Sequence, residues 1–243
     1  MAGLFLTDIE LSRFRSHRKA RLVPDGRPVA LYGPNGAGKT NVLEALSLLS
    51  PGRGLRRAGA EELAQKPGAP GWKVAAVVRS GEDAFEVETW AEAGQPRQVR
   101  IDGKAAPQVA LGRALRVVWL VPSMDRLWTE GAEGRRRFLD RIAMSFDPGH
   151  AEAVLAYEKA MRERNRLLKD MVRDSHWYQA LERQMAEAGE AIRQARDAAL
   201  SRLAAAQAGA DTAFPAAELS IVTEERDVDR VVEASREIFA ALA

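Results

Sequence analysis

The sequence predicts an α/β fold followed by a mainly helical region, and three features support this prediction. A glycine-rich loop near the amino terminus lies between a short apolar run and a helical pattern. Runs rich in valine and aromatic residues then alternate with turn signals, which is typical of antiparallel strands. From Gly134 onward, apolar residues recur at spacings of three and four, which indicates helices. A chain of 243 residues suffices for one large domain or two small ones.

The first elements are two strands, Leu4 to Leu11 and His17 to Val23, which we expect to pair as an antiparallel hairpin. A short apolar strand is predicted over Pro28 to Tyr32, and a helix with one apolar face over Asn41 to Leu49. The glycine-rich loop lies between that strand and that helix.

This loop has the complete spacing G-x-x-x-x-G-K-[ST] of a phosphate-binding loop. Side chains at Gly36 or Gly38 would hold the backbone N–H groups away from a bound polyphosphate. Free amides at the helix start, assisted by a partial charge of about +0.5, would then face the phosphates. Lys39 is the cation expected at the β and γ phosphates, and the Thr40 hydroxyl is the expected ligand of Mg²⁺. The predicted nucleotide-binding residues are Gly33, Pro34, Asn35, Gly36, Ala37, Gly38, Lys39 and Thr40.

A plain glycine-rich turn with a solvated lysine is the alternative interpretation of this segment. The apolar run before the loop and the helical pattern after it favour the phosphate loop, because that motif needs both.

Three further strands, Trp72 to Arg79, Phe85 to Ala91 and Gln98 to Ile101, are predicted to form an antiparallel meander that ends at the turn Asp102-Gly103. Leu115 to Val121 is expected to be another strand. Its apolar centre predicts that it is buried.

Helices are predicted over Arg135 to Phe146 and Ala151 to Val172, and Asp174 with Ser175 offers an N-cap for a third helix. Two long helices joined by a short polar break suggest an antiparallel arm. Packing of both helices on the core is an equally good interpretation, since an apolar seam does not identify its partner. The seam of the third helix consists of Leu181, Met185, Ala188, Ile192, Ala195, Ala199 and Leu203.

A last strand over Glu218 to Thr223 and a helix over Arg230 to Leu242 complete the predicted elements.

Composition excludes several classes of protein. The chain has no cysteine, so disulfides and thiolate metal sites are excluded, and three scattered histidines argue against a zinc site. No signal-peptide pattern and no apolar run of about 18 residues is present, which predicts a cytoplasmic protein without a membrane partner. Ten Lys or Arg stand against four Asp or Glu between Met1 and Gly59, so the phosphate loop lies in a basic region.

Six segments of the chain follow one another in a characteristic order. They are Phe14-Arg15, Gly33 to Leu46, the arginine loop Gly52 to Arg57, Pro122 with Asp125, Arg136 to Asp140 and Arg164 to Leu168. Together they resemble RecF, a family of bacterial DNA replication and repair proteins, and the resemblance extends over essentially the whole chain.

The resemblance implies a P-loop NTPase head of ABC/SMC type, an α/β fold with an antiparallel β subdomain and a helical second domain. Residues 1–130 would form the ATPase head, with the antiparallel β insertion at about 72–121. Residues 131–243 would form the helical domain, with the long helical hairpin and the terminal strand and helix.

The resemblance also implies the function. The expected protein binds ATP and Mg²⁺ through Lys39 and Thr40, with Asn41 next to the phosphates, and closes as an ATP-dependent homodimer with weak ATPase activity. It would bind single-stranded or gapped DNA in replication, recombinational repair and the SOS response, and load recombination proteins there with RecO and RecR.

Two groups of arginines are candidates for contacts to DNA backbone phosphates, one in the glycine-rich arginine loop and one at a helix start. The candidates are Arg53, Arg56, Arg57, Arg135, Arg136 and Arg137. A solvated or internally paired cluster is the alternative. Aromatic and basic residues do not interleave along the sequence, so we expect contacts that are insensitive to base sequence.

The chain departs from the family pattern where catalysis is concerned. RecF proteins carry an ABC signature and a Walker B strand with a catalytic acid in a later part, and neither is visible here. The run Val117 to Val121 ends in Pro122 rather than an acid, and Ile221-Val222 is too short before Glu224. Hydrolysis needs an acid to place the metal and orient water, so we expect an amino-terminal portion that binds ATP weakly and hydrolyses it negligibly. Without a neighbouring strand, Val29 to Tyr32 would leave an exposed apolar edge.

Two other classes remain open at this point. A phosphate-loop kinase acting on a small molecule is disfavoured by the strand meander and the long helices. An ABC transporter-type ATPase subunit should show a signature sequence and a membrane partner.

Overall fold

A computed structural model describes residues 4–129, 131–210 and 215–222. The chain divides into two compact units, residues 1–195 and 196–243. Nearly all described elements belong to the first unit, and the last helix crosses the boundary between the two.

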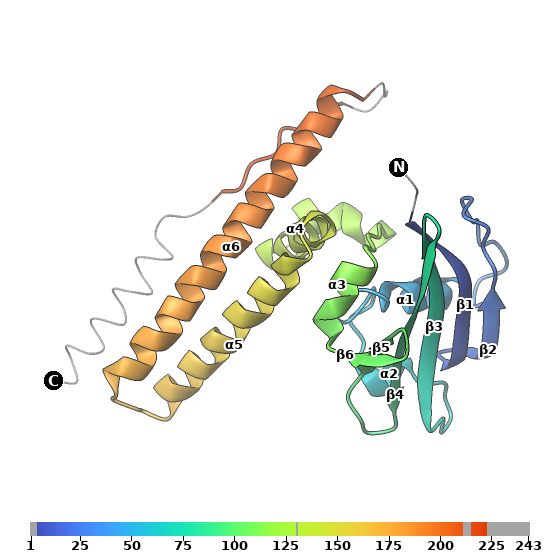
Figure 1. Ribbon diagram of the computed structural model, residues 1–243, viewed down its shortest axis with the longest axis horizontal. Coiled ribbons are helices and arrows are strands. Elements are labelled where there is room, and N and C mark those ends of the chain that lie inside the picture. The colour runs from blue at the N-terminus through green and yellow to red at the C-terminus, as the bar shows by residue number, and fades with distance from the viewer. Residues whose placement is uncertain (1–3, 130, 211–214, 223–243) are drawn as a thin grey trace. The chain divides into compact units, whose positions relative to one another are not determined.

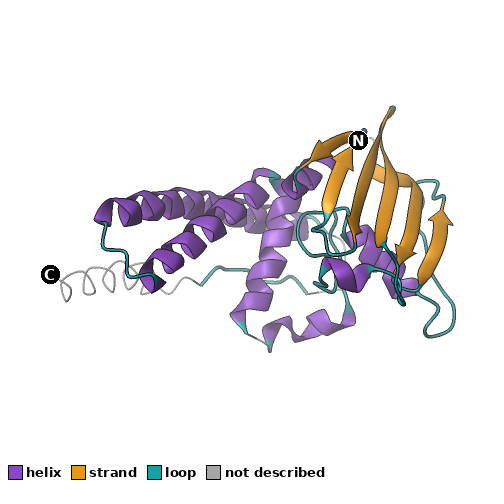
Figure 2. Ribbon diagram, turned by 90° about the horizontal axis from the view of Figure 1, so that it is seen from below, coloured by secondary structure: helices purple, strands orange, loops and turns teal. Residues whose placement is uncertain are grey.

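The first unit contains one sheet with the strand order β2-β1-β3-β4-β5-β6, in which every neighbouring pair is antiparallel. Figure 2 shows the strands as one curved layer. The strands are β1 (Leu4–Phe14), β2 (His17–Leu22), β3 (Gly71–Ser80), β4 (Asp83–Glu92), β5 (Gln98–Ile101) and β6 (Lys104–Ala106).

The predicted hairpin and meander are therefore confirmed, but they are not separate structures, because β3 pairs along nearly the whole of β1. The turn at Asp102 and Gly103 has φ angles of 47° and 73°, the left-handed pair that a tight hairpin requires. This turn leads into β6, which has three residues and was too short to predict.

One face of the sheet packs against helix α1 (Lys39–Ser47) and the residues after it. Leu11 and Phe14 of β1 and Val74 of β3 are fully buried there, together with Leu48 and Leu49. This core holds the start of α1 at a fixed place beside the end of β1.

The later helices are α4 (Ala132–Phe146), α5 (Gly149–Lys169) and α6 (Ser175–Ala208). The side chain of Arg164 in α5 donates to Glu182 in α6 over 3.1 Å, and nearer the start of α5 Tyr157 lies against Gly189. These contacts run in opposite directions along the two helices, so α5 and α6 form the antiparallel hairpin that the sequence suggested (Figure 1).

The predicted N-cap of α6 is also confirmed. The Asp174 carboxylate accepts a hydrogen bond of 2.9 Å from the backbone N–H of His176, which would otherwise lack a partner at the helix start. In the predicted seam, Leu181, Ala188 and Ile192 are buried. No helix that the structure describes has a stretch long and apolar enough to cross a bilayer.

Four short elements were not predicted. They are α2 (Ala60–Leu63), α3 (Leu111–Ala114) and the 3₁₀ segments Gln108–Ala110 and Pro122–Trp128.

Two predicted strands are wrong. Residues 28–32 and 115–121 pair with no strand among the described residues and have no regular secondary structure. The reason is the same for both, since an apolar run becomes a strand only where a neighbour accepts and donates its backbone hydrogen bonds.

The exposure of these runs differs from the prediction in one case and agrees in the other. Val118 and Leu120 are 53% and 80% exposed, so the run 115–121 is not buried at its centre. Val29 and Tyr32 are 58% and 95% exposed, and this apolar surface next to the phosphate loop is as expected.

The predicted strand at Glu218 to Thr223 is wrong for residues 218–222, which have no regular secondary structure in the described chain. Thr223 and the predicted helix over Arg230 to Leu242 lie outside the described residues. The proposed boundary between head and helical domain near residue 130 stays a prediction.

Candidate nucleotide-binding site

The predicted phosphate loop forms a compact turn that leads directly into α1. The N–H of Ala37 donates to the Pro34 carbonyl, and the amides of Asn41 and Val42 both donate to the Gly38 carbonyl, which starts the helix. No side chain caps this helix start, and its first turn holds no acidic residue. The first amides of α1 are therefore available to an anion, with the positive end of the helix dipole behind them.

The side chain of Lys39 bridges the loop. Its ammonium donates to the carbonyl oxygens of Gly33 and Pro34, each over 2.8 Å. A cation on a long stem held only by two carbonyls can transfer to phosphate oxygens, which are stronger acceptors because they are charged. The neighbouring Thr40 is exposed, and its hydroxyl has no partner within the described chain.

The two inner glycines have left-handed φ angles, 84° at Gly36 and 90° at Gly38, which L side chains rarely adopt. A Cβ on Gly36 would meet no atom within 4 Å, so this glycine faces the open mouth of the loop. A Cβ on Gly38 would lie 2.5 Å from His17 Nε2 and 2.9 Å from Ser16 Oγ. Gly36 thus leaves room for a ligand, and Gly38 permits close packing of the loop on the β1–β2 turn.

That turn supplies contacts that sequence reasoning did not identify. The Nε2 atom of His17 lies 3.2 Å from the Gly38 carbonyl, and the Asn41 amide donates to Ser16 Oγ over 2.8 Å. In the sequence, this segment was noted only because Phe14-Arg15 contributes to the family resemblance. Its position beside the phosphate loop depends on strand pairing, which the sequence pattern alone does not show.

Behind the loop lies a buried carboxylate, Glu44 of α1, which is 1% exposed. Arg15 donates to both of its oxygens, over 2.9 and 2.7 Å, and also to the carbonyl of Glu62. Arg56 donates to a Glu44 oxygen over 3.0 Å and to the Asn41 side-chain oxygen over 2.9 Å. The carboxylate therefore joins the β1–β2 turn, the phosphate-loop helix and the arginine loop.

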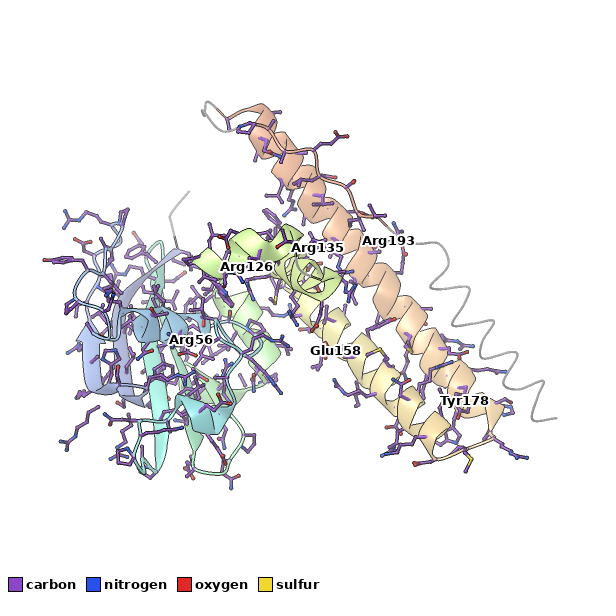
Figure 3. All side chains as sticks on the ribbon, turned by 180° about the vertical axis from the view of Figure 1, so that it is seen from behind. Arg56, Arg126, Arg135, Glu158, Tyr178 and Arg193 are labelled. Atoms are coloured by element: carbon purple, nitrogen blue, oxygen red, sulfur yellow. The ribbon has the colours of Figure 1, made fainter. Side chains whose placement is uncertain are left out.

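The candidate DNA arginines of the arginine loop fall into two kinds. Arg56, labelled in Figure 3, is internally paired as just described. Arg53 and Arg57 are exposed, and within the part of the chain that the structure describes they make no hydrogen bond or ion pair.

The second group lies at the start of α4. Arg135 donates to the carbonyl of Leu127 over 3.1 Å, and Arg137 pairs with Glu133 one turn earlier in the helix. Arg136 is exposed on the helix surface. The structure thus brings Arg56 to helix α1, which follows the phosphate loop. Arg135, Arg136 and Arg137 lie on a separate element, α4.

An arginine that sequence reasoning missed holds the arginine loop in place. Arg97 donates to the carbonyls of Gly52 and Leu48, over 2.6 and 2.5 Å, and to Thr89 Oγ1 over 2.8 Å. Burial lowers the pKa of this guanidinium to about 10. It satisfies the Leu48 carbonyl at the carboxyl end of α1, which the helix cannot satisfy itself, and the Gly52 carbonyl of the loop.

Within residues 4–129, 131–210 and 215–222, no group of three or more His, Asp or Glu side chains is arranged to hold a metal ion.

Comparison with known proteins agrees with this geometry. The family model described as "AAA domain, putative AbiEii toxin, Type IV TA system" matches residues 29–103, which include the phosphate loop. Two solved RecF structures, described as RecF-ATP and RecF-ATPrS, match 84% of this chain and 56% of their own, with TM-scores of 0.72 and 0.73 at 26% and 24% identity. These matches confirm the predicted fold class, a phosphate-loop ATPase head with an antiparallel β subdomain and helices.

Curated relatives extend the match to most of the chain. The DNA replication and repair protein RecF of Caulobacter vibrioides is 44% identical over 237 residues, and that of Mesorhizobium japonicum is 47% identical over 229 residues. The chain spans 61% and 60% of the length of these two relatives. The RecF protein of Caulobacter sp. strain K31 is 41% identical over 261 residues, covering 100% of this chain and 67% of the relative. The chain belongs to the RecF family of DNA replication and repair proteins.

Proposed function

We propose that this chain is the ATP-binding part of a RecF-type protein that acts on DNA in the cytoplasm, in replication and recombinational repair. The single observation that carries the proposal is the geometry of the phosphate loop. An uncapped helix start, open space at Gly36 and a lysine held only by carbonyls are the features that anion binding at a phosphate loop requires.

The residues present fit ATP with Mg²⁺. Backbone amides from Gly36 to Thr40 would surround the β and γ phosphates, and Lys39 would exchange its two carbonyl partners for phosphate oxygens. The exposed Thr40 hydroxyl would be the protein ligand of Mg²⁺, whose other positions are filled by phosphate and water. Asn41 would lie beside the phosphates, held by Ser16 and Arg56.

Isothermal titration with MgATP tests this assignment. Replacing Lys39 by alanine should lower affinity at least tenfold, since it removes the charge from the phosphate site. Lys159→Ala is the matched control, because that lysine is exposed on α5. Equal affinities for the two variants and the parent chain would contradict the proposal.

Hydrolysis is a separate part of the proposal. Among the described residues no group of three or more acids and histidines could hold a metal, and the first turn of α1 has no acidic residue, so turnover by this chain should be negligible. A steady ATPase rate that disappears in Lys39→Ala would show that this chain supplies its own catalytic acid.

DNA binding and assembly rest on family membership. We propose sequence-insensitive binding of single-stranded or gapped DNA, closure as an ATP-dependent homodimer, and cooperation with RecO- and RecR-type mediators. Neither the kinase nor the transporter alternative is favoured, because the relatives named here are DNA replication and repair proteins.

The arginine loop supplies a test of the DNA contacts. Arg53 and Arg57 are free to contact backbone phosphates. Each alanine variant should therefore reduce the slope of log affinity against log salt by about 1, which corresponds to one phosphate contact. Unchanged salt dependence in both variants would remove the arginine loop from the DNA interface.

A further inference from the structure

A groove of about 420 Å³ lies where the ends of β1 to β4 meet, outside the site already described. Its lining includes Ser12 of β1, Lys19 of β2, Lys73 of β3 and Trp90 of β4. These four residues are direct neighbours across the sheet, because Lys19 pairs with Ser12, Ser12 with Lys73, and Lys73 with Trp90.

This row faces away from α1. The neighbours of Lys73 in β3, Trp72 and Val74, are 3% and 0% exposed and belong to the core under α1. Since successive side chains of a strand point to opposite faces, Lys73 and its partners across the sheet occupy the other face. The core residues Trp72 and Ala91 also line the groove at its end, but no residue of the phosphate loop does.

The groove is strongly basic. Its lining contains four cations, Arg13, Arg18, Lys19 and Lys73, and one carboxylate, Glu92.

Two of these cations are already paired and two are not. Lys73 pairs with Glu88, and Lys19 lies 3.4 Å from Glu10. The side chains of Arg13 and Arg18 are exposed and have no partner among the described residues. Arg13 has a left-handed φ of 50°, which is uncommon for a residue other than glycine and turns its side chain out of the alternation of β1. Unpaired arginines beside a groove are suited to phosphate groups, which they bind through two parallel hydrogen bonds.

An aromatic ring completes the groove. Trp90 is half-buried, and the guanidinium of Arg100 lies 5.0 Å from the centre of its ring. Arg100 is itself held by Glu88 over 3.3 Å, so the ring is supported from the β5 side. The ring also lines the groove, where a planar ligand can stack on it.

We propose that this groove binds single-stranded DNA, with a base stacked on Trp90 and backbone phosphates contacted by Arg13 and Arg18. The combination of unpaired arginines and an aromatic ring favours single-stranded DNA over other anionic ligands. An acidic peptide would use the cations alone, and the bases of an intact duplex are stacked on each other and cannot reach the ring. The inference rests on the proposed function, because it takes DNA as the class of ligand from it, and it adds a base-stacking site to that function.

The sequence does not show this site, because its aromatic residue and its cations come from four strands. Aromatic and basic residues that are separate along the chain become interleaved across the sheet through strand pairing.

Fluorescence anisotropy with a labelled oligothymidylate of about ten nucleotides tests the stacking. Trp90→Ala should weaken binding by about 5- to 150-fold, and Trp90→Phe should weaken it much less because it keeps an aromatic face. Trp177→Ala is the matched control, since Trp177 is a 60% exposed tryptophan on α6. An oligonucleotide with abasic sites should bind the parent chain about as weakly as the normal oligonucleotide binds Trp90→Ala.

The charge contacts are tested by salt dependence. Arg18→Ala should reduce the slope of log affinity against log salt by about 0.7 for a single-stranded ligand, whereas Arg79→Ala, an exposed arginine at the far end of β3, should leave it unchanged. A polyglutamate peptide of equal charge should not displace the oligonucleotide.

A third measurement does not depend on the folding of any variant. Ultraviolet cross-linking of an iodouridine-substituted oligonucleotide to the parent chain should label Trp90, as identified by mass spectrometry. Equal affinity of Trp90→Ala and Trp177→Ala, or cross-links confined to other residues, would overturn the groove assignment while leaving the proposed DNA binding intact. No oligonucleotide binding by the parent chain would overturn both, and MgATP titration would still report separately on the phosphate loop.

Discussion

Replacing Glu44 by alanine should destabilise the chain by about 2–4 kcal/mol. The carboxylate is 1% exposed and holds two guanidinium groups, Arg15 at 21% and Arg56 at 44% side-chain exposure. Removing one partner of a fully buried ion pair costs about 3–5 kcal/mol, whereas exposed pairs contribute about 0.2–1 kcal/mol. The Arg15 pair should resemble the buried pairs in its energy, and the Arg56 pair the exposed pairs, because the more exposed Arg56 side chain can hydrogen-bond to water instead.

Urea unfolding of the parent chain and of five variants, three single and two double, separates the two pairs. A double-mutant cycle between Glu44→Gln and Arg15→Gln should give a coupling of about 2 kcal/mol, and the cycle with Arg56→Gln about 1 kcal/mol or less. Gln keeps the shape of Glu44 and removes its charge, whereas Arg→Gln shortens the side chain and removes the guanidinium group, so each cycle reports the loss of the charged pair. A larger coupling for Arg56 than for Arg15, or a neutral Glu44→Ala, would refute this reasoning from burial.

Three other predictions follow from single contacts. Gly36→Ala should lower the free energy of unfolding by about 1–2 kcal/mol, because its backbone is left-handed. Gly38→Ala should lower it by about 1–3 kcal/mol more, because its Cβ would lie 2.5 Å from a histidine ring nitrogen. Equal losses of stability in thermal unfolding would contradict the packing described. Arg97→Met should cost about 2–4 kcal/mol by leaving helix-end carbonyls without donors, and Arg97→Lys should restore only part of this, as urea unfolding can measure. The hydrogen bond from Arg21 lowers the pKa of Asp8 below 3.8. This exposed pair therefore stabilises the fold above pH 3.8, and the stabilisation is lost as pH falls through the lowered pKa. Asp8→Asn should make the stability less dependent on pH on the acid side, and an unchanged pH profile would argue against the pair.

Local signals in the sequence were sufficient for the phosphate loop and the strand meander. A phosphate loop is defined by its own backbone and needs glycines and a lysine at fixed spacing, so the motif predicted the loop and the start of α1. The meander was predictable because each strand is followed by a turn signal and pairs with its neighbour in the sequence.

The surroundings of the loop could not be predicted in this way. In the sequence, Glu44 is one of several polar residues in a helix with an apolar face, and no local pattern indicates that it is buried. Its partners Arg15 and Arg56 lie 29 and 12 residues away in the chain. Arg15 meets it because β1 packs beside α1, and Arg56 because the arginine loop folds back on α1. The role of Arg97 is hidden for the same reason, since its carbonyl acceptors are 45 to 49 residues distant.

Arg56 shows why a count of arginines does not identify ligand contacts. A guanidinium in water gains the full free energy of a new phosphate contact, but Arg56 must first give up Glu44 and Asn41. Leaving Glu44 with one guanidinium instead of two opposes that exchange, because an undercompensated buried carboxylate is costly. Arg53 and Arg57 meet no such opposition. In the absence of nucleotide the arginine loop should therefore contact phosphates through its outer arginines, while Arg56 acts as a structural link to the phosphate-loop helix.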